Sequence, residues 1–410
     1  MSLSIWFLGL KDNERQFLCN IVKSRIKSMK KNILVINAHD LDCGAGLSCA
    51  STMVILANAG YNIVHVSSSK GKIVDFLKEK GIPTIHSRFS CWYPMEHNGG
   101  RMNCFQRIRS IQHNLREDVI SLIYIRKALK SLGFLPDLVY TNTILFPIGT
   151  LIASKYHVPH VFHIREYGYQ DFRMYFLLGT KISSYWAKKS TVMSLCISKG
   201  VQNVWNDFFD GKTKLLYNGI PNKGVVFRIP EFDKQIFNII LVGRLSEEKG
   251  QEFVIRRLPE IIAKAKCKLS LDLWGEGKDK AKLVELVRTL HLEDFVHFCG
   301  FSENINYSKY HLAIMSSRSE GFGRTTVEYM FHSIPIIGYD EGATPELVKD
   351  KVTGRLYKTS EEFIDCVLDA LSSYPIYQDY ARNAFKYSIE NFTIENYKSK
   401  ILDFFENQIK

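Results

Sequence analysis

Two glutamates that flank a glycine-broken turn, Glu320 and Glu328, suggest a ligand site in the stretch SRSEGFGRTTVEYM. The apolar run HLAIMSS before them predicts a buried parallel strand, and a short helix should open near Thr325. Gly321 and Gly323 let the backbone approach a ligand, and free N–H groups at a helix start favour an anion. A carboxylate accepts two hydroxyl hydrogen bonds at once, which suits a vicinal diol. The stretch therefore predicts contacts for a phosphate and a sugar together.

Two cations follow another apolar run. The segment IILVGRLSEEKG ends a predicted strand at Gly243 and supplies Arg244 and Lys249 on the next turn. Arginine can hold a diphosphate through two hydrogen bonds, and lysine adds a point charge. If a diphosphate is the leaving group, positive charge lowers the barrier where the negative charge develops.

Glycines also follow strands elsewhere in the chain. Gly275 lies in LWGEGKDK, and Gly44 and Gly46 lie in AHDLDCGAGLS after the first predicted strand, where a glycine-rich loop commonly opens a ligand cleft. Asp40 and Asp42 in that loop form D-x-D, which can hold a divalent metal on a nucleotide diphosphate. We discount a metal, because no partner acids are evident and the second half already supplies cations.

A third group of polar side chains lies in HIREYG, at the end of the predicted strand HVFHIRE. The group consists of His163, Arg165 and Glu166. A histidine there could hydrogen-bond a sugar hydroxyl or relay a proton.

Each of these motifs also has a purely structural interpretation that stays open. Glu328 could only favour the helix dipole and Glu320 could be a solvated loop acid, while the two cations could be surface residues. The glycines could serve tight turns, and His163 could be a hydrogen-bonded residue of the core.

The elements that position these residues alternate between strand and helix in two sets. Strands are expected in the first half at NILVINAHD, YNIVHVSSS, IPTIHS, DLVYTNT, HVFHIRE, TVMSLCIS and KLLYNG. The second half has FNIILVGRL, KLSLDLWGEG, VHFCGF, LAIMSS, IPIIGYD and GRLYK. Such alternation predicts an α/β protein with two doubly wound, Rossmann-like domains and ligands at the carboxyl ends of the strands.

The boundary is expected near NGIPNKGVVFRIPEFDKQ, between domains 1–222 and 223–392, and residues 393–410 form an amphipathic helix. Residues 90–120 lack a clear period and predict a loop or insertion.

The composition is that of a soluble protein of two to three domains. The chain has 410 residues, of which 46% are hydrophobic and 23% charged, and no apolar run is long enough to cross a bilayer. The start lacks the pattern of a signal peptide, so we expect a cytoplasmic protein. Nine cysteines at irregular spacing form no C-x-x-C pair, which indicates reduced thiols rather than a metal or redox motif.

The net charge of +12 is confined to the first half. Residues 1–222 contain 28 lysines and arginines against 14 acids, and residues 11–31 contain seven of those basic residues. Such a face attracts anionic lipid headgroups at ~1 kcal/mol per basic residue near the surface. It could also attract nucleic acid, or be a solvated face without a partner.

Two motifs together, G-R-L-x-x-x-K-G and E-G-F-G-x-x-x-x-E, resemble those of the retaining, family 4-like "group 1" glycosyltransferases. Those enzymes use nucleotide sugars and have the GT-B fold. The resemblance is specific over about residues 237–358 and weaker elsewhere, through AHDLDCGAG, PDLVYTNT, HIRE and LLYNGIP. It implies a second domain that binds the UDP- or GDP-type donor sugar, a first domain that binds the acceptor, and a final helix that packs back on the first domain.

The resemblance also implies a role for each candidate residue. Arg244 and Lys249 would bind the diphosphate, Glu328 the ribose hydroxyls, and Glu320 would lie near the transferred sugar. The residues expected at the donor are Gly243, Arg244, Lys249, Gly275, Gly321, Phe322, Gly323, Arg324, Thr325 and Glu328. The acceptor side would include Gly44, Gly46 and Glu166. Family members often have His directly before the acid in the strand-end motif, whereas here Arg165 precedes Glu166, so His163 and Arg165 both stay candidates for contact with the sugar.

The implied reaction moves a sugar to a hydroxyl acceptor with retention at the anomeric carbon and without a metal or other cofactor. The leaving phosphate would help to deprotonate the incoming hydroxyl, and the protein would supply positioning and charge. A basic first domain fits a lipid-linked or polysaccharide acceptor for surface glycan synthesis, met at the inner, anionic face of the cell membrane.

Two other classes remain as alternatives. A nicotinamide-dependent enzyme could use a doubly wound sheet, but no G-x-G-x-x-G with a later acid follows the first strand. A nucleic-acid-binding protein could use the basic half, but its basic residues lack interleaved aromatic platforms of a known module, so we expect no nucleic-acid partner.

Overall fold

The first half of the chain forms a seven-stranded parallel sheet. The computed structural model describes residues 31–94, 100–222 and 225–408. The strand order is β3-β2-β1-β4-β5-β6-β7, and every pairing is parallel. The strands are β1 (Asn32–Asn37), β2 (Asn62–Ser67), β3 (Thr84–His86), β4 (Leu138–Asn142), β5 (His160–Ile164), β6 (Thr191–Cys196) and β7 (Thr213–Leu215). The order reverses direction between β1 and β4, which is where a doubly wound sheet opens a crevice.

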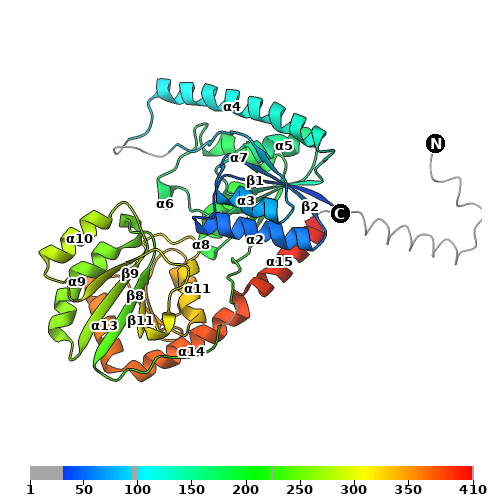
Figure 1. Cartoon of the computed structure of the whole chain (residues 1–410). Coiled ribbons are helices and arrows are strands. Elements are labelled where there is room, and N and C mark those ends of the chain that lie inside the picture. The colour runs from blue at the N-terminus through cyan, green and yellow to red at the C-terminus, as the bar shows by residue number, and fades with distance from the viewer. Residues whose placement is uncertain (1–30, 95–99, 223–224, 409–410) are drawn as a thin grey trace, which may run out of the picture.

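The second half repeats this plan with six parallel strands in the order β10-β9-β8-β11-β12-β13. They are β8 (Ile236–Val242), β9 (Lys268–Trp274), β10 (Val296–Gly300), β11 (Leu312–Met315), β12 (Ile336–Tyr339) and β13 (Arg355–Tyr357). All thirteen strands fall on the segments expected from the sequence, and the predicted α/β fold class is confirmed. The central strands are apolar almost throughout, because helices cover both faces of each sheet (Figure 1).

Helices form the crossovers. In the first half they are α2 (Gly44–Asn58), α3 (Lys72–Glu79), α4 (Cys104–Ser131), α5 (Ile148–Tyr156), α6 (Tyr169–Phe172), α7 (Thr180–Lys188) and α8 (Lys199–Asn206). In the second they are α9 (Gln251–Lys264), α10 (Lys280–Thr289), α11 (Arg324–Phe331), α12 (Thr344–Leu347), α13 (Ser360–Ser372), α14 (Tyr374–Asn391) and α15 (Ile394–Gln408).

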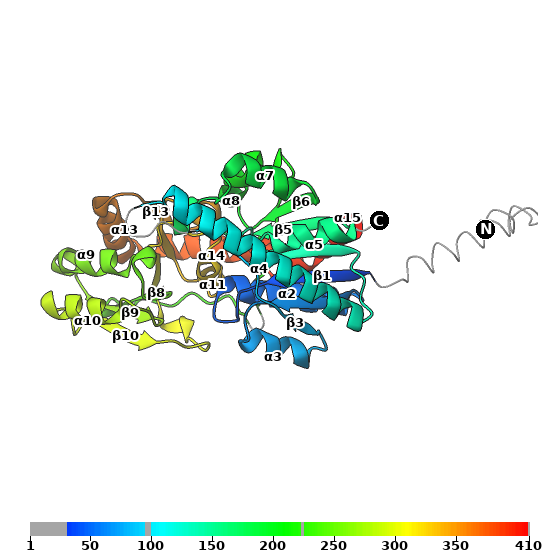
Figure 2. The same ribbon diagram turned by 90° about the horizontal axis from the view of Figure 1, so that it is seen from above.

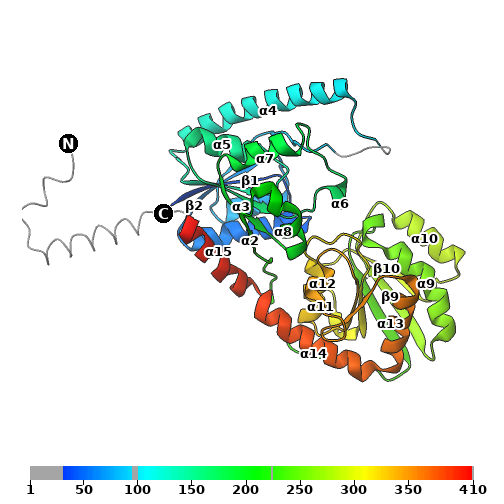
Figure 3. The same cartoon turned by 180° about the vertical axis from the view of Figure 1, so that it is seen from behind.

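The last two helices lead back to the first sheet (Figure 3). Helix α15 buries Tyr397, Ile401, Phe404 and Phe405 in the same apolar cluster as strand β1 and helix α2, and the Tyr397 hydroxyl lies 2.6 Å from that of Thr52. The final helix therefore completes the core beside the first sheet. Because the sheets end at Leu215 and begin at Ile236, we keep 1–222 and 223–392 as the proposed domains.

The prediction of a loop or insertion over residues 90–120 was wrong for residues 104–120, which belong to the 28-residue helix α4. The helix opens with a capping box, in which Asn103 and Gln106 satisfy each other's backbone N–H groups. No clear period marks α4 in the sequence, because apolar residues occur on its exposed face as well as on its buried one.

The two halves meet through polar and apolar contacts. One apolar cluster contains Ile164 and Ile197 of the first half together with Phe322 and Val327 of the second. The carboxylate of Glu346, from α12, accepts hydrogen bonds at 2.8 and 2.7 Å from the backbone N–H groups of residues 199 and 200, which begin α8. A carboxylate at a helix start is favoured by the helix dipole, so these contacts hold the second half against the first.

Two predictions from composition can be compared with the described part of the chain. The eight cysteines that it includes are all free thiols. No helix within it is long and apolar enough to span a bilayer. Of the basic residues in 11–31, all but Lys31 lie outside the described residues.

Candidate active site

The loops after β8, β9 and β10 are fastened to one another at the carboxyl edge of the second sheet. The backbone N–H of Gly243 donates to Trp274, and that of Gly275 donates to Gly300. A Cβ on Gly275, which has a φ of 137°, would lie 2.1 Å from the carbonyl oxygen of Gly243. Only glycine fits there, so Gly275 allows the loop after β9 to lie directly against the predicted phosphate loop.

Lys249 and Glu320 form an ion pair across two of these loops. Lys249 ends a short 3-10 helix after β8, and its Nζ lies 2.6 Å from Oε2 of Glu320, which follows β11. The Ser316 hydroxyl donates to the Lys249 carbonyl at 2.7 Å, which fixes the two loops together. The side chains are 33% and 16% exposed, so the pair keeps access to the cleft. The side chain of Arg244, on the same loop, is exposed.

Glu328 lies in the second turn of α11, behind the glycine turn. Gly323 caps this helix with a φ of 88°. Burial raises the pKa of Glu328, while the Arg324 guanidinium opposes that shift. The Phe322 side chain is buried against Tyr217 and Phe392 and so anchors the turn. Thr325, half-buried, follows Arg324 in the first helical turn.

Arg324 reaches across to the first half. Its Nη1 donates to the Ser48 hydroxyl at 3.0 Å, and a Cβ on Gly44 would lie 2.8 Å from its Cδ. A Cβ on Gly46 would lie 1.7 Å from the Asp40 carbonyl oxygen, so Gly46 permits the tight turn into α2. The glycine-rich first loop and the second half's glycine turn therefore face each other.

The Asp40 carboxylate caps helix α3. It accepts hydrogen bonds from the backbone N–H groups of Lys72 and Ile73, at 3.0 and 2.7 Å. This carboxylate is occupied within the fold, and no group of three or more metal-ligating side chains gathers among residues 31–94, 100–222 and 225–408.

His163 and Arg165 are buried at the end of β5. The guanidinium of Arg165 donates to the side-chain oxygens of Asn142 and Asn218. His163 Nδ1 lies 2.6 Å from the Tyr140 hydroxyl. Burial, and then the neighbouring Arg165, hold the pKa of His163 well below its usual range, so the imidazole is neutral. A Cβ on Gly321 would lie 2.8 Å from the Arg165 carbonyl, which brings the donor turn to this strand end.

The Glu166 carboxylate points into the first half rather than into open cleft. It accepts hydrogen bonds from the Thr143 hydroxyl and from the backbone N–H groups of Ile144 and Arg165. Thr143 has a φ of 116°, a strained conformation for a β-branched residue. The buried glutamate therefore holds the end of β4 in an otherwise unfavourable geometry.

Glu166 should give the protein a pH-dependent stability. Burial raises its pKa to about 7, against the opposing hydrogen bonds of Thr143 and Ile144. The folded state then binds this proton more tightly than the unfolded chain does, so its contribution to stability is lost as the pH rises. We expect the free energy of unfolding to fall by roughly 3 kcal/mol between about pH 4.5 and about pH 7 from this group alone.

Denaturant unfolding at pH 5 and pH 8 measures this contribution. Glu166→Gln removes the titrating group and nearly keeps its shape, so the difference between the two pH values should shrink in the variant. An unchanged difference would show that Glu166 does not titrate in this range.

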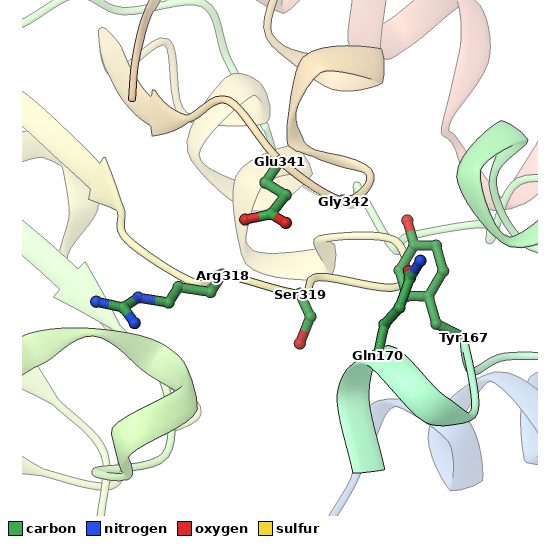
Figure 4. A pocket seen from close by; sticks show the side chains of 6 residues that line it. All are labelled: Tyr167, Gln170, Arg318, Ser319, Glu341 and Gly342. Atoms are coloured by element: carbon green, nitrogen blue, oxygen red, sulfur yellow. The ribbon is translucent and has the colours of Figure 1, made fainter. Parts of the chain in front are cut away.

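A cavity of about 230 Å³ opens beside Glu320, between the two halves. Figure 4 shows its lining side chains, which come from the loops after β11 and β12 and from the segment around α6. They are Tyr167, Gln170, Arg318, Ser319, Glu341 and Gly342. The backbone N–H of Ala343 donates to the Glu320 carbonyl at 2.8 Å, so the cavity adjoins the donor turn. None of these six residues was a candidate from the sequence, although GYDEGATPELV has the same strand-then-glycine pattern as the other loops.

The structure thus brings most of the candidates to one cleft. Gly321 lies against the end of β5 and Arg324 against the first loop, while Lys249 pairs with Glu320, the neighbour of Gly321. His163 and Glu166 also lie at that strand end, but their side chains are enclosed in the first half.

The chain is similar in sequence to known glycosyltransferases. Residues 225–387 match the family model "Glycosyl transferases group 1". The chain is 34% identical over 121 residues to the UDP-N-acetylglucosamine–peptide N-acetylglucosaminyltransferase GtfA subunit of Streptococcus parasanguinis, which covers 28% of this chain and 22% of that protein. It is 26% identical to an uncharacterised glycosyltransferase of Methanocaldococcus jannaschii, over 54% of this chain and 60% of the relative. The matches therefore span less than two thirds of either relative.

Solved structures share the whole fold. Anabaena HepE in complex with UDP and glucose superposes with a TM-score of 0.69 at 19% identity, over 91% of this chain and 99% of that one. The fold is therefore GT-B, and residues 225–387 of the chain match the model of the group 1 glycosyltransferases.

Proposed function

We propose that the protein transfers a glycosyl group from a UDP-sugar to a hydroxyl acceptor, with retention at the anomeric carbon and without a metal. The observation that carries the proposal is the ion pair between Lys249 and Glu320, at the edge of the second sheet and beside the glycine turn before α11. A relative and a structural neighbour are named with UDP or a UDP-sugar, which favours UDP over GDP.

The donor would lie across the carboxyl ends of β8 and β11. Lys249 and the exposed Arg244 would hold the diphosphate, with the backbone of Gly243 and Gly275 close by. Backbone N–H groups at the start of α11 add partial positive charge for the same phosphates. Glu328 would accept hydrogen bonds from the two ribose hydroxyls.

Glu320 would lie at the transferred sugar, where it also keeps Lys249 in place before the donor binds. As the bond to the diphosphate breaks, the negative charge that develops on the leaving group is stabilised by Lys249 and Arg244. The leaving phosphate oxygen takes the proton of the acceptor hydroxyl, which attacks from the same face. The buried network of Arg165, Asn142 and Asn218 supports the acceptor side by fixing the end of β5.

The acceptor would be a lipid-linked or polysaccharide intermediate of surface glycan synthesis. Its hydroxyl group would enter from the first half, beside the cavity lined by Tyr167 and Gln170. The protein would then work at the cytoplasmic side of the cell membrane. Water has to be excluded from this cleft, because it would otherwise hydrolyse the donor.

A thermal-shift screen with UDP, GDP, several UDP-sugars and NADH tests the proposal. A ligand that binds only the folded state raises the melting temperature, so UDP and one UDP-sugar should raise it in the presence of EDTA. Stabilisation by NADH and not by UDP would replace the proposal with a nicotinamide-dependent enzyme, and stabilisation by oligonucleotides alone would favour nucleic-acid binding. With the donor known, the anomeric configuration of the product by NMR decides between retention and inversion.

A further inference from the structure

The outer face of α4 exposes an unusual row of large apolar side chains. The helix lies along the outer edge of the first domain, and among the residues that the structure describes Figures 1 and 3 show no other element beyond it. Seven of its large hydrophobic residues are exposed, by between 46% and 76%: Phe105, Ile108, Leu115, Val119, Ile120, Ile123 and Tyr124. Single exposed residues of this kind are normal, but seven on the outer side of one helix mark a surface for interaction.

This row is separate from the face that packs on the domain. The buried residues of α4 are Asp118, Ser121, Ile125 and Leu129. Asp118 accepts hydrogen bonds from the backbone and hydroxyl of Ser90, so the inner face is already satisfied. Residues 105, 108, 115, 119 and 123 recur at helical spacing on the other side. The outer row therefore contributes little to the core.

The same outer face is strongly basic. The exposed residues of α4 include Arg109, Arg116, Arg126, Lys127 and Lys130 and not one acid, since Asp118 is buried and Glu117 is half-buried. None of these five cations forms an ion pair with another residue of the described chain. Apolar and basic side chains are thus interleaved over one helix face.

We propose that the outer face of α4 is the surface with which the protein lies on an anionic lipid bilayer. An interfacial helix buries its apolar side chains at the level of the headgroups while lysine and arginine meet anionic phosphate. A second copy of the chain would bring five cations against five like charges. Nucleic acid would meet the cations but would leave the isoleucines, the leucine and the valine exposed. Of these three occupants, only the bilayer satisfies both halves of the pattern.

The start of α4 is joined to the cleft. The backbone N–H of Met102 donates to the Tyr175 hydroxyl at 3.0 Å, and the guanidinium of Arg107 donates to the Leu177 carbonyl. These two partners directly follow α6, whose Gln170 lines the cavity beside Glu320. Figure 2 shows α4 running over the first domain from the side of the second. A lipid-linked acceptor held at this surface would therefore arrive near the cavity, and this step alone rests on the proposed function.

Vesicle co-sedimentation of the full chain tests the surface. The vesicles are phosphatidylcholine with or without phosphatidylglycerol, at low and high salt. One variant carries Ile108→Glu and Ile123→Glu, and a second carries Arg116→Glu and Lys127→Glu. Each should weaken binding to the anionic vesicles at least about ten-fold, and salt should weaken binding of the unaltered chain. The control Ile376→Glu, at a residue of α14 in the second half that is 50% exposed, should bind as the unaltered chain does.

The thermal shift with UDP separates this inference from the proposed function. All three variants should keep their melting temperature and their response to UDP, because the changed residues are exposed and lie outside the cleft. Undiminished vesicle binding by both α4 variants would overturn the inference, whatever UDP does. So would a dimer in the unaltered chain that the α4 changes dissolve, or binding to anionic vesicles that is lost equally in the Ile376→Glu control.

Discussion

We expect Lys249→Ala to lower kcat/KM for glycosyl transfer by about 100- to 1000-fold, mostly through kcat. The ammonium group 2.6 Å from Glu320 is the best-placed charge for a departing diphosphate, and removal of one such stabilising group typically costs about 3–4 kcal/mol in the transition state. Its loss also leaves the Glu320 carboxylate without its cation, beside the same leaving group. Steady-state kinetics with the true donor measures kcat and KM separately and so tests this expectation.

Lys264→Ala is the matched control. Lys264 forms an ion pair of 2.8 Å with Glu260, but on the exposed surface of α9. Exposed pairs contribute about 0–1 kcal/mol, so its loss should leave kcat/KM within about two-fold. Turnover of Lys249→Ala at the rate of the control would remove Lys249 from the mechanism, and a uniform rise in KM alone would restrict it to ground-state binding.

The sequence was sufficient for the architecture because parallel strands buried on both faces are short apolar runs. Apolar runs such as NIILV and LAIM are followed by glycine or polar residues where the chain leaves the sheet. The same pattern therefore marks both the strand and the loop that follows it. Lys249 and Glu320 follow two such runs, and β8 and β11 are neighbours in the sheet. Sequence order and sheet topology together therefore brought this pair into one cleft.

The misses have a different physical origin. The hydrophobic period of α4 is obscured in the sequence, because its exposed face is as apolar as its buried face. The first part of the helix was therefore predicted as a loop or insertion. The orientation of Glu166 depends on Thr143 and Ile144, which lie more than twenty residues away in the sequence. No local pattern predicts that a strand-end acid turns inward to hold another strand. The contact of Arg324 with Ser48 joins residues 276 positions apart, and only the folded chain specifies it.

Glu328 should decide whether the second half binds a nucleotide or only a phosphate. We expect Glu328→Gln to raise the Kd for UDP by about 10- to 100-fold, because the amide can no longer accept from both ribose hydroxyls as a charged group does. Inorganic pyrophosphate lacks a ribose, so its Kd should not change in this variant, whereas Lys249→Ala should weaken both ligands. Burial raises the pKa of Glu328. As the pH is lowered, the affinity for UDP should therefore begin to fall at a higher pH than it would with an ordinary glutamate.

Calorimetric titration of the two ligands against the two variants gives four comparisons. Glu293→Gln, an exposed acid that precedes β10 and so lies at the opposite edge of the same sheet, is the control for a change of charge alone. If Glu328→Gln weakens pyrophosphate as much as UDP, the residue acts on the phosphates or on the fold of α11 and not on the ribose. If Glu328→Gln changes the affinity for neither ligand, the ribose hydroxyls of UDP bind elsewhere, and Glu328 and Lys249 do not hold the same donor. The pattern of the four affinities therefore tests the placement of the whole nucleotide, with the sugar-bearing phosphate at Lys249 and the ribose at Glu328.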